Sequence, residues 1–255
     1  MPLFGTLELS TAVTSLPVLR DLDTEPWSLP KAEILQMAFE VPRATHALLP
    51  KAVHPAIPSY VTLLVSRYPE SPVGPFLLAQ LRLMARAGAH PRGFILRAYA
   101  STPEAAAALR ERWGMPAEAA TVSLKRRHDR VMAQVLRDGV PVLDAALVDP
   151  QPISGGDVQY IHSVTLAQAP VDGKTGTWLV QVDPRYTFHK AERGRPTVSR
   201  LDGEAWGAPG LALQNPISST VCTCDTDLPR IRFVMDPEVP VIRGTKKIRE
   251  SREAE

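Results

Sequence analysis

The sequence predicts a protein of the α+β class whose main element is a mostly antiparallel β-sheet, accompanied by a few short helices. Extended apolar segments occur at 61–67, 76–86 and 94–100, and further extended segments flank tight-turn sequences. Strands joined by tight turns pair antiparallel, whereas a parallel connection needs a crossover of roughly a dozen residues or more. Few helices beside many such strands are typical of the α+β class.

The second extended segment shows the clearest alternation. Leu77, Ala79, Leu81 and Leu83 would share one face of a strand. The segment 68–75 before it contains three prolines. We therefore predict an ordered loop there rather than a helix or a strand.

A helix is predicted between two capping residues. With Ser101 as the N-cap, Glu104 takes the third helical position and completes a capping box, and Pro103 is tolerated in the first turn. An alanine-rich run continues the helix to Trp113, and Gly114 suits the C-terminal cap.

Two β-hairpins are predicted in the second half of the chain, each built around an Asp-Gly turn. The first joins the segments 131–136 and 140–147, and the second joins 157–167 and 177–183. Their turn sequences fix the strand pairing locally, so both hairpins are expected to be antiparallel.

A last strand is expected at 231–235, followed by a charged C-terminal sequence. We find no internal repeat and no long flexible linker. The sequence therefore predicts a single domain over 1–243 and a charged, disordered tail over 244–255.

The composition argues against several classes of protein. Lys and Arg number 29 against 27 Asp and Glu, and both signs are spread along the chain. A protein that binds nucleic acid or a membrane surface would concentrate its basic residues. No apolar run approaches the roughly 18 residues of a membrane span. A secretory signal begins with basic residues, whereas this sequence has none before Arg20. We expect a cytoplasmic protein without nucleic-acid or membrane partners.

Neither the cysteines nor the histidines predict a metal centre. Cys222 and Cys224 would point to the same face of a strand. A zinc site needs two more ligands, and no histidine lies at ligand spacing nearby, so two ordinary reduced cysteines are favoured. Among the histidines we single out His162, inside an extended segment, as a candidate for exposure to a pocket. No metal and no cofactor is predicted.

The sequence Arg-Glu-Arg-Trp-Gly-Met-Pro at 110–116 resembles the signature of the acetoacetate decarboxylase family, which reads roughly Gly-Arg-Glu-x-Trp-Gly-x-Pro-Lys-Lys. Other segments resemble the family in the same order along the chain, over roughly residues 31 to 242: Leu48-Leu49-Pro50, Tyr68-Pro69-Glu70, Pro91-Arg92-Gly93-Phe94, Val171-Asp172-Gly173 and Leu228-Pro229-Arg230. The resemblance implies a cone-like antiparallel β-barrel around a central pocket, in subunits that form homo-oligomers.

The chain departs from the family at the paired lysines, where it carries Ala117 and Glu118. The resemblance implies that the first lysine condenses with a ketone, and that an apolar pocket and a second cation keep this amine neutral. Alanine cannot form an imine, and glutamate would raise the pKa of a nearby amine. Lys125, in a charged run eight residues after Ala117, is a disfavoured substitute nucleophile.

Five candidate site residues are singled out, Arg97 from its place in a strand and the others from the resemblance, and all but Ala117 have an ordinary structural alternative. Glu70 would serve as general acid or base, or would only cap backbone amides of its loop. Arg97 could bind a substrate carboxylate through its planar guanidinium, or only cover a sheet edge. Lys31 falls near a pocket arginine of the family, and Ala117 and Glu118 occupy the lysine positions; Lys31 and Glu118 could equally be exposed surface residues.

Three functions stay open. The first is an enzyme that binds a small or polyketide-like oxo compound, as in secondary metabolism, and catalyses dehydration, enolisation or cyclisation by acid/base chemistry without an imine. The second is a non-catalytic protein that binds an oxo acid or ketone in the inherited pocket. The third is a decarboxylase that uses another lysine. The sequence alone does not decide whether the chain is an enzyme.

Overall fold

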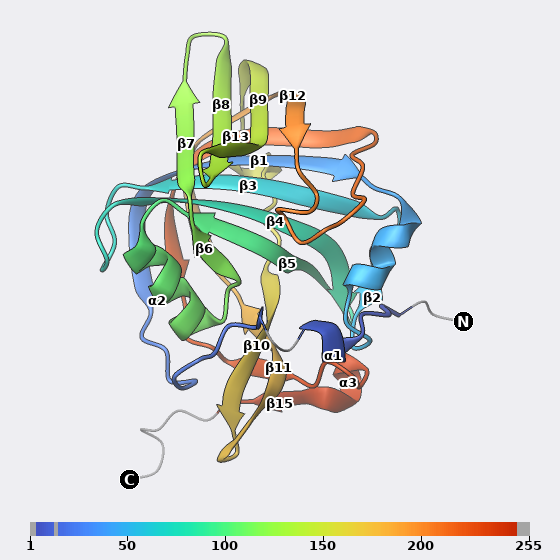
Figure 1. Ribbon diagram of the computed structural model, residues 1–255. Coiled ribbons are helices and arrows are strands. Elements are labelled where there is room, and N and C mark those ends of the chain that lie inside the picture. The colour runs from blue at the N-terminus through green and yellow to red at the C-terminus, as the bar shows by residue number, and fades with distance from the viewer. Residues whose placement is uncertain (1–3, 13–14, 249–255) are drawn as a thin grey trace.

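The computed structural model describes residues 4–12 and 15–248 of the chain. One 15-stranded sheet dominates the described residues, and the helices beside it are few and short (Figure 1). The predicted α+β class with mostly antiparallel strands is therefore confirmed.

The strands in chain order are β1 Trp27–Glu40, β2 His54–Pro55, β3 Tyr60–Tyr68, β4 Phe76–Ala87, β5 His90–Ala100, β6 Ala117–Ala119, β7 Thr121–Arg126, β8 Arg130–Arg137, β9 Val140–Ile153, β10 Ser163–Val171, β11 Lys174–Val182, β12 Arg185–Leu201, β13 Pro216–Leu228, β14 Phe233–Met235 and β15 Thr245–Lys247. The helices are α1 Leu9–Ala12, α2 Pro103–Trp113, α3 Val241–Gly244 and the 3-10 helices η2 Arg43–Leu48 and η3 Gly155–Asp157.

The sheet is open. Its strands follow the order β15-β14-β11-β10-β5-β4-β3-β1-β13-β12-β9-β8-β7, and the end strands β15 and β7 are not paired with each other among the described residues. All pairs are antiparallel except β10 with β5 and β5 with β6. The contact between β10 and β5 covers only two residue pairs. A closed, cone-like barrel, as the resemblance implies, is thus not confirmed.

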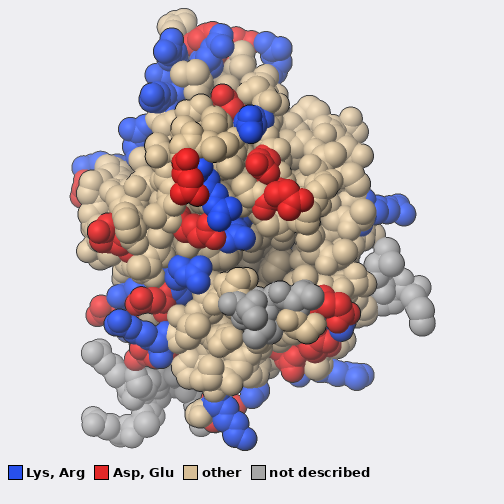
Figure 2. Space-filling model, in the orientation of Figure 1, with Lys and Arg blue, Asp and Glu red and all other residues tan. Residues whose placement is uncertain are grey.

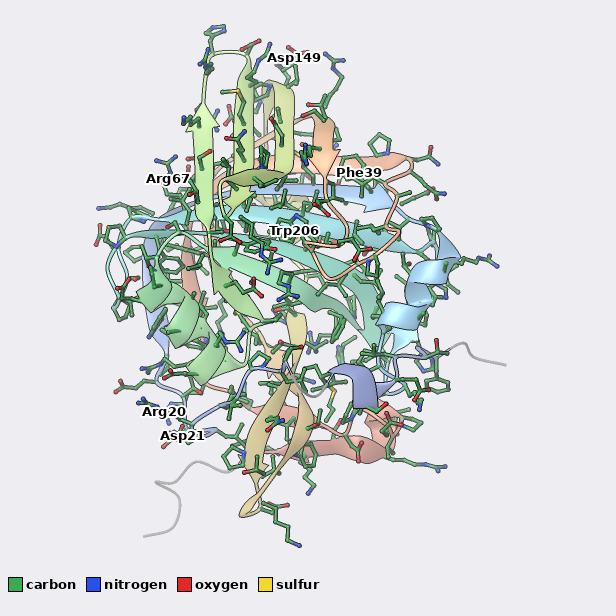
Figure 3. The ribbon with its side chains drawn as sticks, viewed as in Figure 1. Arg20, Asp21, Phe39, Arg67, Asp149 and Trp206 are labelled. Carbon is green, nitrogen blue, oxygen red and sulfur yellow. The ribbon has the colours of Figure 1, made fainter. Side chains whose placement is uncertain are left out.

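Both faces of the central strands are buried. On one face a core cluster includes Leu35, Leu81 and Trp206, and Trp206 lies in the middle of the molecule (Figure 3). On the other face a second cluster contains Leu78 and the residues of α2 that face the sheet. The second cluster surrounds the candidate site described below.

Most predicted elements are present. The segments 61–67, 76–86 and 94–100 lie in β3, β4 and β5, and the loop 68–75 separates the first two. The turn between β8 and β9 has positive φ at both Asp138 and Gly139, as a two-residue hairpin of this kind requires.

The second hairpin is present but starts later than predicted. Its first strand, β10, runs over Ser163–Val171 instead of 157–167. The residues 155–157 form η3, and the following segment up to 162 runs as irregular chain. This irregular segment lines the pocket described below, so the difference matters for the site.

The helix α2 is capped one residue later than predicted. The side chain of Thr102, not of Ser101, accepts the hydrogen bond from the N–H of Ala105, at 3.2 Å. The Ser101 hydroxyl instead accepts a hydrogen bond from the N–H of Leu77 at 2.8 Å, so it is occupied at the end of the sheet. Glu104 is therefore not at the third position and forms no capping box. Gly114 is the C-cap as predicted, with φ 64°.

The prediction of a disordered tail over 244–255 is wrong for its first part. Residues 245–247 form β15, which pairs with β14, and Lys246 Nζ lies 2.8 Å from the carboxylate of Asp172. An edge strand needs only backbone partners on one side, so a charged sequence can form one. The remainder of the tail, from 249, lies outside the described residues.

Candidate functional site

A small cavity of about 20 Å³, the inner cavity, lies in the second core cluster. Leu29, Phe76, Leu78 and Met115 form apolar parts of its wall. Its polar lining residues come from strands far apart in the sequence: Tyr68, Gln80, Arg82, Ser163, Tyr186 and Thr226. The volume is enough for about one water molecule.

The guanidinium of Arg82 is the only cationic group in this lining. The residue is 6% exposed. It donates hydrogen bonds from Nε and Nη2 to Oε1 of Gln80, the former at 3.0 Å, and from Nη1 to the carbonyl of Ile161 at 3.2 Å. No carboxylate in the described part of the chain forms an ion pair with it. Burial lowers the pKa of Arg82, but a guanidinium stays protonated in proteins.

Arg82 can lie in this position because β5 carries a glycine beside it. A Cβ atom on Gly93 would be 3.0 Å from Cδ of Arg82 and 3.3 Å from Sδ of Met84. The absence of a side chain on Gly93 thus leaves the space that the arginine stem occupies. The N–H of Gly93 also donates to the carbonyl of His162 at 2.8 Å, which fixes the irregular segment against β5.

Two phenols complete the polar part of the inner cavity. Burial raises the pKa of Tyr68 and the pKa of Tyr186, and it outweighs the opposite effect of the nearby Arg82 charge. Both phenols therefore stay protonated at neutral pH and can donate hydrogen bonds to a ligand oxygen.

A larger hollow of about 650 Å³, the outer pocket, adjoins the inner cavity. The two share Pro184 and Tyr186 as lining residues. The rings of Tyr160 and Tyr186 meet edge to face at 4.9 Å, and Phe188 lies 5.4 Å from Tyr160. Pro184 and Tyr186 therefore form a wall between the buried arginine and an accessible, partly aromatic pocket.

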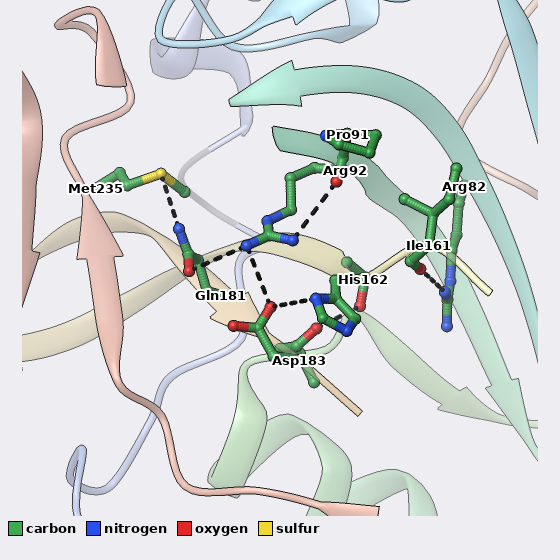
Figure 4. Close-up of polar contacts among 10 residues, drawn as sticks. Arg82, Pro91, Arg92, Ile161, His162, Gln181, Asp183 and Met235 are labelled. Atoms are coloured by element: carbon green, nitrogen blue, oxygen red, sulfur yellow. Dashed lines mark hydrogen bonds and ion pairs between the residues drawn. The ribbon is translucent and has the colours of Figure 1, made fainter. Parts of the chain in front are cut away.

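A charged cluster lies at the wall of the outer pocket (Figure 4), where Arg92 and His162 are lining residues. Oδ1 of Asp183 lies 3.5 Å from Nη2 of Arg92 and 3.4 Å from Nδ1 of His162. Arg92 also reaches Oε1 of Gln181, at 3.5 Å. Nε of Arg92 and Oδ1 of Asp183 are buried and have no hydrogen-bond partner among the described residues. The cluster is thus close in space but incompletely hydrogen-bonded.

The structure places Ala117 beside the inner cavity, although not in its lining. Ala117 is 1% exposed and belongs to the same core cluster as Leu78 and Met115. A longer side chain at 117 would therefore extend into this core cluster, which also forms the wall of the inner cavity.

Glu118 points to the opposite face of the sheet. It is in register with Tyr99, which belongs to the other core cluster. Its carboxylate pairs with Arg97 and, at 3.4 Å, with Arg137. The structure thus brings the predicted site residues Arg97 and Glu118 together, away from the inner cavity.

The other two predicted site residues also meet each other. Nζ of Lys31 lies 3.2 Å from Oε1 of Glu70, with side chains 75% and 57% exposed. They follow the lining residues Leu29 and Tyr68 by two positions each, so the pair lies at the surface next to one end of the cavity.

No lysine lines the inner cavity or the outer pocket in the described part of the chain. None of the seven lysines is buried, and Lys125 is exposed on β7. A ketone in the inner cavity would therefore meet a guanidinium and phenols but no amine.

Sequence reasoning missed the polar lining of the inner cavity. Gln80 and Arg82 alternate with Ala79, Leu81 and Leu83, a pattern that by itself is typical of a strand with one solvent-facing side. They are buried because β4 is covered on both faces. The signal that could have found them is the pair of a mid-strand arginine and a glycine on the next strand of the hairpin.

The described residues contain no group of three or more His, Cys, Asp or Glu side chains arranged to hold a metal ion. Among these residues there is also no helix with the length and apolarity that crossing a membrane requires. Figure 2 shows acidic and basic side chains interspersed over one face of the molecule.

The sequence profile of the family described as "Acetoacetate decarboxylase (ADC)" matches residues 16–237. The chain belongs to the acetoacetate decarboxylase family. No curated protein matches it in a sequence comparison.

Solved structures of the family share the fold at low sequence identity. The acetoacetate decarboxylase from Legionella pneumophila is 21% identical, with a TM-score of 0.72 over 89% of this chain and 96% of that one. The enduracididine biosynthesis enzyme MppR, solved in complex with pyruvate, is 14% identical, with a TM-score of 0.65 over 83% and 95%. An acetoacetate decarboxylase-like enzyme from Sphingomonas wittichii RW1 is 16% identical, with a TM-score of 0.62 over 83% and 92%.

Proposed function

We propose that this acetoacetate decarboxylase-like protein binds a small oxo acid across the inner cavity and the outer pocket, with the ligand carboxylate on Arg82. We further propose that it acts on the ligand by acid/base, lyase-type chemistry that uses no imine. The single observation that supports this most is the buried guanidinium of Arg82, which has no carboxylate partner among the described residues.

A buried cation without a counter-ion is expensive. The desolvation penalty is several kcal/mol per ion in proteins. The neutral groups beside Arg82, which are Gln80, the Ile161 carbonyl and the Tyr186 phenol, offset only part of it. A carboxylate would supply the missing charge and match the planar donors of the guanidinium. The relative MppR binds pyruvate, which is an oxo acid and supports the same ligand class here.

The sizes of the two hollows fit this division of the ligand. The inner cavity has room for about one water molecule, so a carboxylate would fit only with a shift of the Tyr186 ring. The remainder of the ligand would lie in the outer pocket, which is about 650 Å³. The phenol of Tyr186, on the shared wall, would then donate to the oxo oxygen.

The chemistry proposed here needs proton transfer but no covalent amine. Enolisation, dehydration or cyclisation of an oxo acid are reactions of this kind. Glu70, the acid/base residue proposed from sequence, would act on a ligand only at the exposed end of β3, where it pairs with Lys31. Unchanged turnover in Glu70→Gln would exclude Glu70 as the acid/base residue. We also propose a cytoplasmic location and a homo-oligomeric assembly.

The second candidate function is a binding protein without catalysis. The replacement of both family lysines by Ala117 and Glu118 favours it. A decarboxylase that uses another lysine is the least supported, since no lysine lines the two hollows described above.

Calorimetric titration with pyruvate and with acetoacetate tests the proposal. Arg82→Gln should weaken binding about 10- to 150-fold, because a hydrogen bond to a charged group contributes about 1.5–3 kcal/mol. Arg86→Gln, the same substitution at an exposed position of the same strand, should bind as the wild type does. Equal affinity of Arg82→Gln and wild type would refute the proposed site.

The same ligands separate the enzyme from the binding protein. Incubation with the wild type, followed by NMR of the ligand, should show conversion or solvent exchange of its carbon-bound hydrogens if the protein is an enzyme. A ligand that binds through Arg82 and stays chemically unchanged would instead support the non-catalytic alternative.

A further inference from the structure

His162 belongs to the charged cluster and also lines the outer pocket. Its side chain is 43% exposed and lines that pocket. Its Nδ1 lies 3.4 Å from Oδ1 of Asp183, and its backbone is held by the N–H of Gly93. Nε2, the other ring nitrogen, makes no hydrogen bond among the described residues.

His162 is also a direct neighbour of the proposed carboxylate site. The carbonyl of the preceding residue, Ile161, accepts a hydrogen bond from Nη1 of Arg82 at 3.2 Å. Figure 4 shows Asp183 joined to both Arg92 and His162, with the Arg82–Ile161 contact beside them. A ligand anchored on Arg82 and extending past Tyr186 would therefore pass the imidazole.

We infer that His162, oriented by Asp183, is the residue that exchanges protons with the carbon next to the oxo group of the ligand. This inference rests on the proposed function, since it requires a ligand carboxylate on Arg82. His162 would be a catalytic residue, and Asp183 a positioning residue that acts through it.

The step balances within the site. Nε2 of neutral His162 takes a proton from the carbon next to the carbonyl, and the C–H electron pair becomes the C=C bond of an enolate. The carbonyl π pair moves to oxygen, where the Tyr186 phenol donates a hydrogen bond. Return of a proton from the imidazolium to carbon regenerates the oxo acid, and solvent exchanges with the imidazolium proton in between.

The charges around His162 suit a general base. Burial lowers its pKa; Asp183 beyond the end of β11 raises it, and Arg92 on β5 and Arg82 on β4 lower it. His90 and Arg185 also line the outer pocket. The imidazole is therefore neutral near pH 7, the form that accepts a proton, and Asp183 would stabilise the imidazolium once it forms.

Hydrogen–deuterium exchange into pyruvate tests this without knowledge of the final product. In deuterated buffer, loss of the pyruvate methyl signal by ¹H NMR reports the proton transfer. His162→Gln should slow the protein-catalysed exchange about 100-fold or more, while calorimetry shows pyruvate affinity within about threefold of wild type. His128→Gln, an exposed position in the turn between β7 and β8, is the matched control and should exchange as the wild type does.

The pH profile tests Asp183 separately. The exchange rate should rise with pH through the pKa of His162, with a midpoint below 6.5. Asp183→Asn removes the charge that raises this pKa, so the midpoint should move to lower pH. A residue with only a structural role would change the rate without moving the midpoint.

The outcomes distinguish this inference from the proposed function. If the wild type and His162→Gln exchange at the same rate, the role of His162 is overturned and the Arg82 site is left intact. Binding of pyruvate through Arg82 without any exchange by the wild type would also overturn it. Both the proposed function and the role of His162 are supported if Arg82→Gln loses binding and His162→Gln loses exchange but still binds pyruvate.

Discussion

At the scale of single residues, the site is defined by one replacement and one unexpected cation. Ala117 removes the amine on which imine chemistry depends, and its methyl group lies in the core cluster around the inner cavity. Arg82 adds a buried charge to the lining of the same cavity. On the proposed function, this site would hold a ligand carboxylate without a covalent bond.

The geometry predicts that an amine at 117 would be reactive. In Ala117→Lys, the apolar surroundings and the Arg82 charge would both lower the pKa of the new amine, which favours its neutral, nucleophilic form. Borohydride reduction with acetoacetate, followed by intact mass measurement, should give an adduct on this variant and none on the wild type.

Glu118→Lys is the matched control, because residue 118 points to the opposite face of the sheet beside Arg97. It should give no adduct. An adduct on the wild type would show that one of the natural lysines reaches a bound ketone, and would restore the decarboxylase hypothesis.

At the scale of elements, the end of α2 holds position 117 in place. Gly114 closes the helix with φ 64°, and a Cβ atom there would be 2.6 Å from Cβ of Ala167 and 2.7 Å from Cδ1 of Leu19. The carbonyl of Gly114 accepts a hydrogen bond from Thr165 at 2.6 Å. The chain therefore turns from α2 into β6 at a point where β10 is in contact with it.

Because of this contact, replacement of glycine by alanine should lower the free energy of unfolding more at Gly114 than at Gly74, which has no such neighbour. Gly74→Ala introduces a side chain at φ 84° with no atom within 4 Å, so it should cost only the backbone strain of about 1–2 kcal/mol. Gly114→Ala adds the steric conflict with Ala167 and Leu19, which costs about 1–3 kcal/mol more. Urea unfolding of both variants measures the difference, and equal values would show that α2 and β10 are not tightly packed there.

At the scale of the whole molecule, the inner cavity depends on strands from the two ends of the chain. Leu29 comes from β1, Arg82 from β4, Tyr186 from β12 and Thr226 from β13. No fragment of the chain contains the complete site, so a loss of global stability should also reduce ligand binding.

The histidines predict how this stability varies with pH. Burial lowers the pKa of His46, which is 2.6 Å from Oγ of Ser59, and the pKa of His162. The folded state therefore binds fewer protons than the unfolded state, and stability rises with pH through this range. The contribution of the two histidines to stability should be fully present above pH 6.5. It should be lost as the pH falls through their folded-state pKa values.

Urea unfolding at pH 7.5 and pH 5.5 checks this. The loss of stability at the lower pH should be smaller in the double variant His46→Gln, His162→Gln than in the wild type. Asp129 and Asp225 have lowered pKa values, so their contribution to stability is lost only as the pH falls below their ordinary value of 3.8. An unchanged pH dependence in the double variant would therefore contradict the assignment to these histidines.

Local signals in the sequence predicted the hairpins and the body of α2, because turn residues and caps act on their immediate neighbours. They missed β12, whose exposed charged residues hide its strand pattern, and β13, whose small polar residues are buried between β1 and β12. These strands form because neighbouring backbones pair with them. Their own side chains carry little signal.

The same distinction applies to the site. The sequence by itself determined that position 117 carries no amine, since the motif around it is continuous and its register is unambiguous. Only the tertiary structure decided that Arg82 is inside and that Glu70 and Glu118 are paired elsewhere. It also decided that no lysine lines the two hollows in the described part of the chain. The physical reason is that burial of the second face of β4 depends on residues far along the chain, such as Tyr186 of β12 and Thr226 of β13. The alternation of residues along β4 itself carries no information about them.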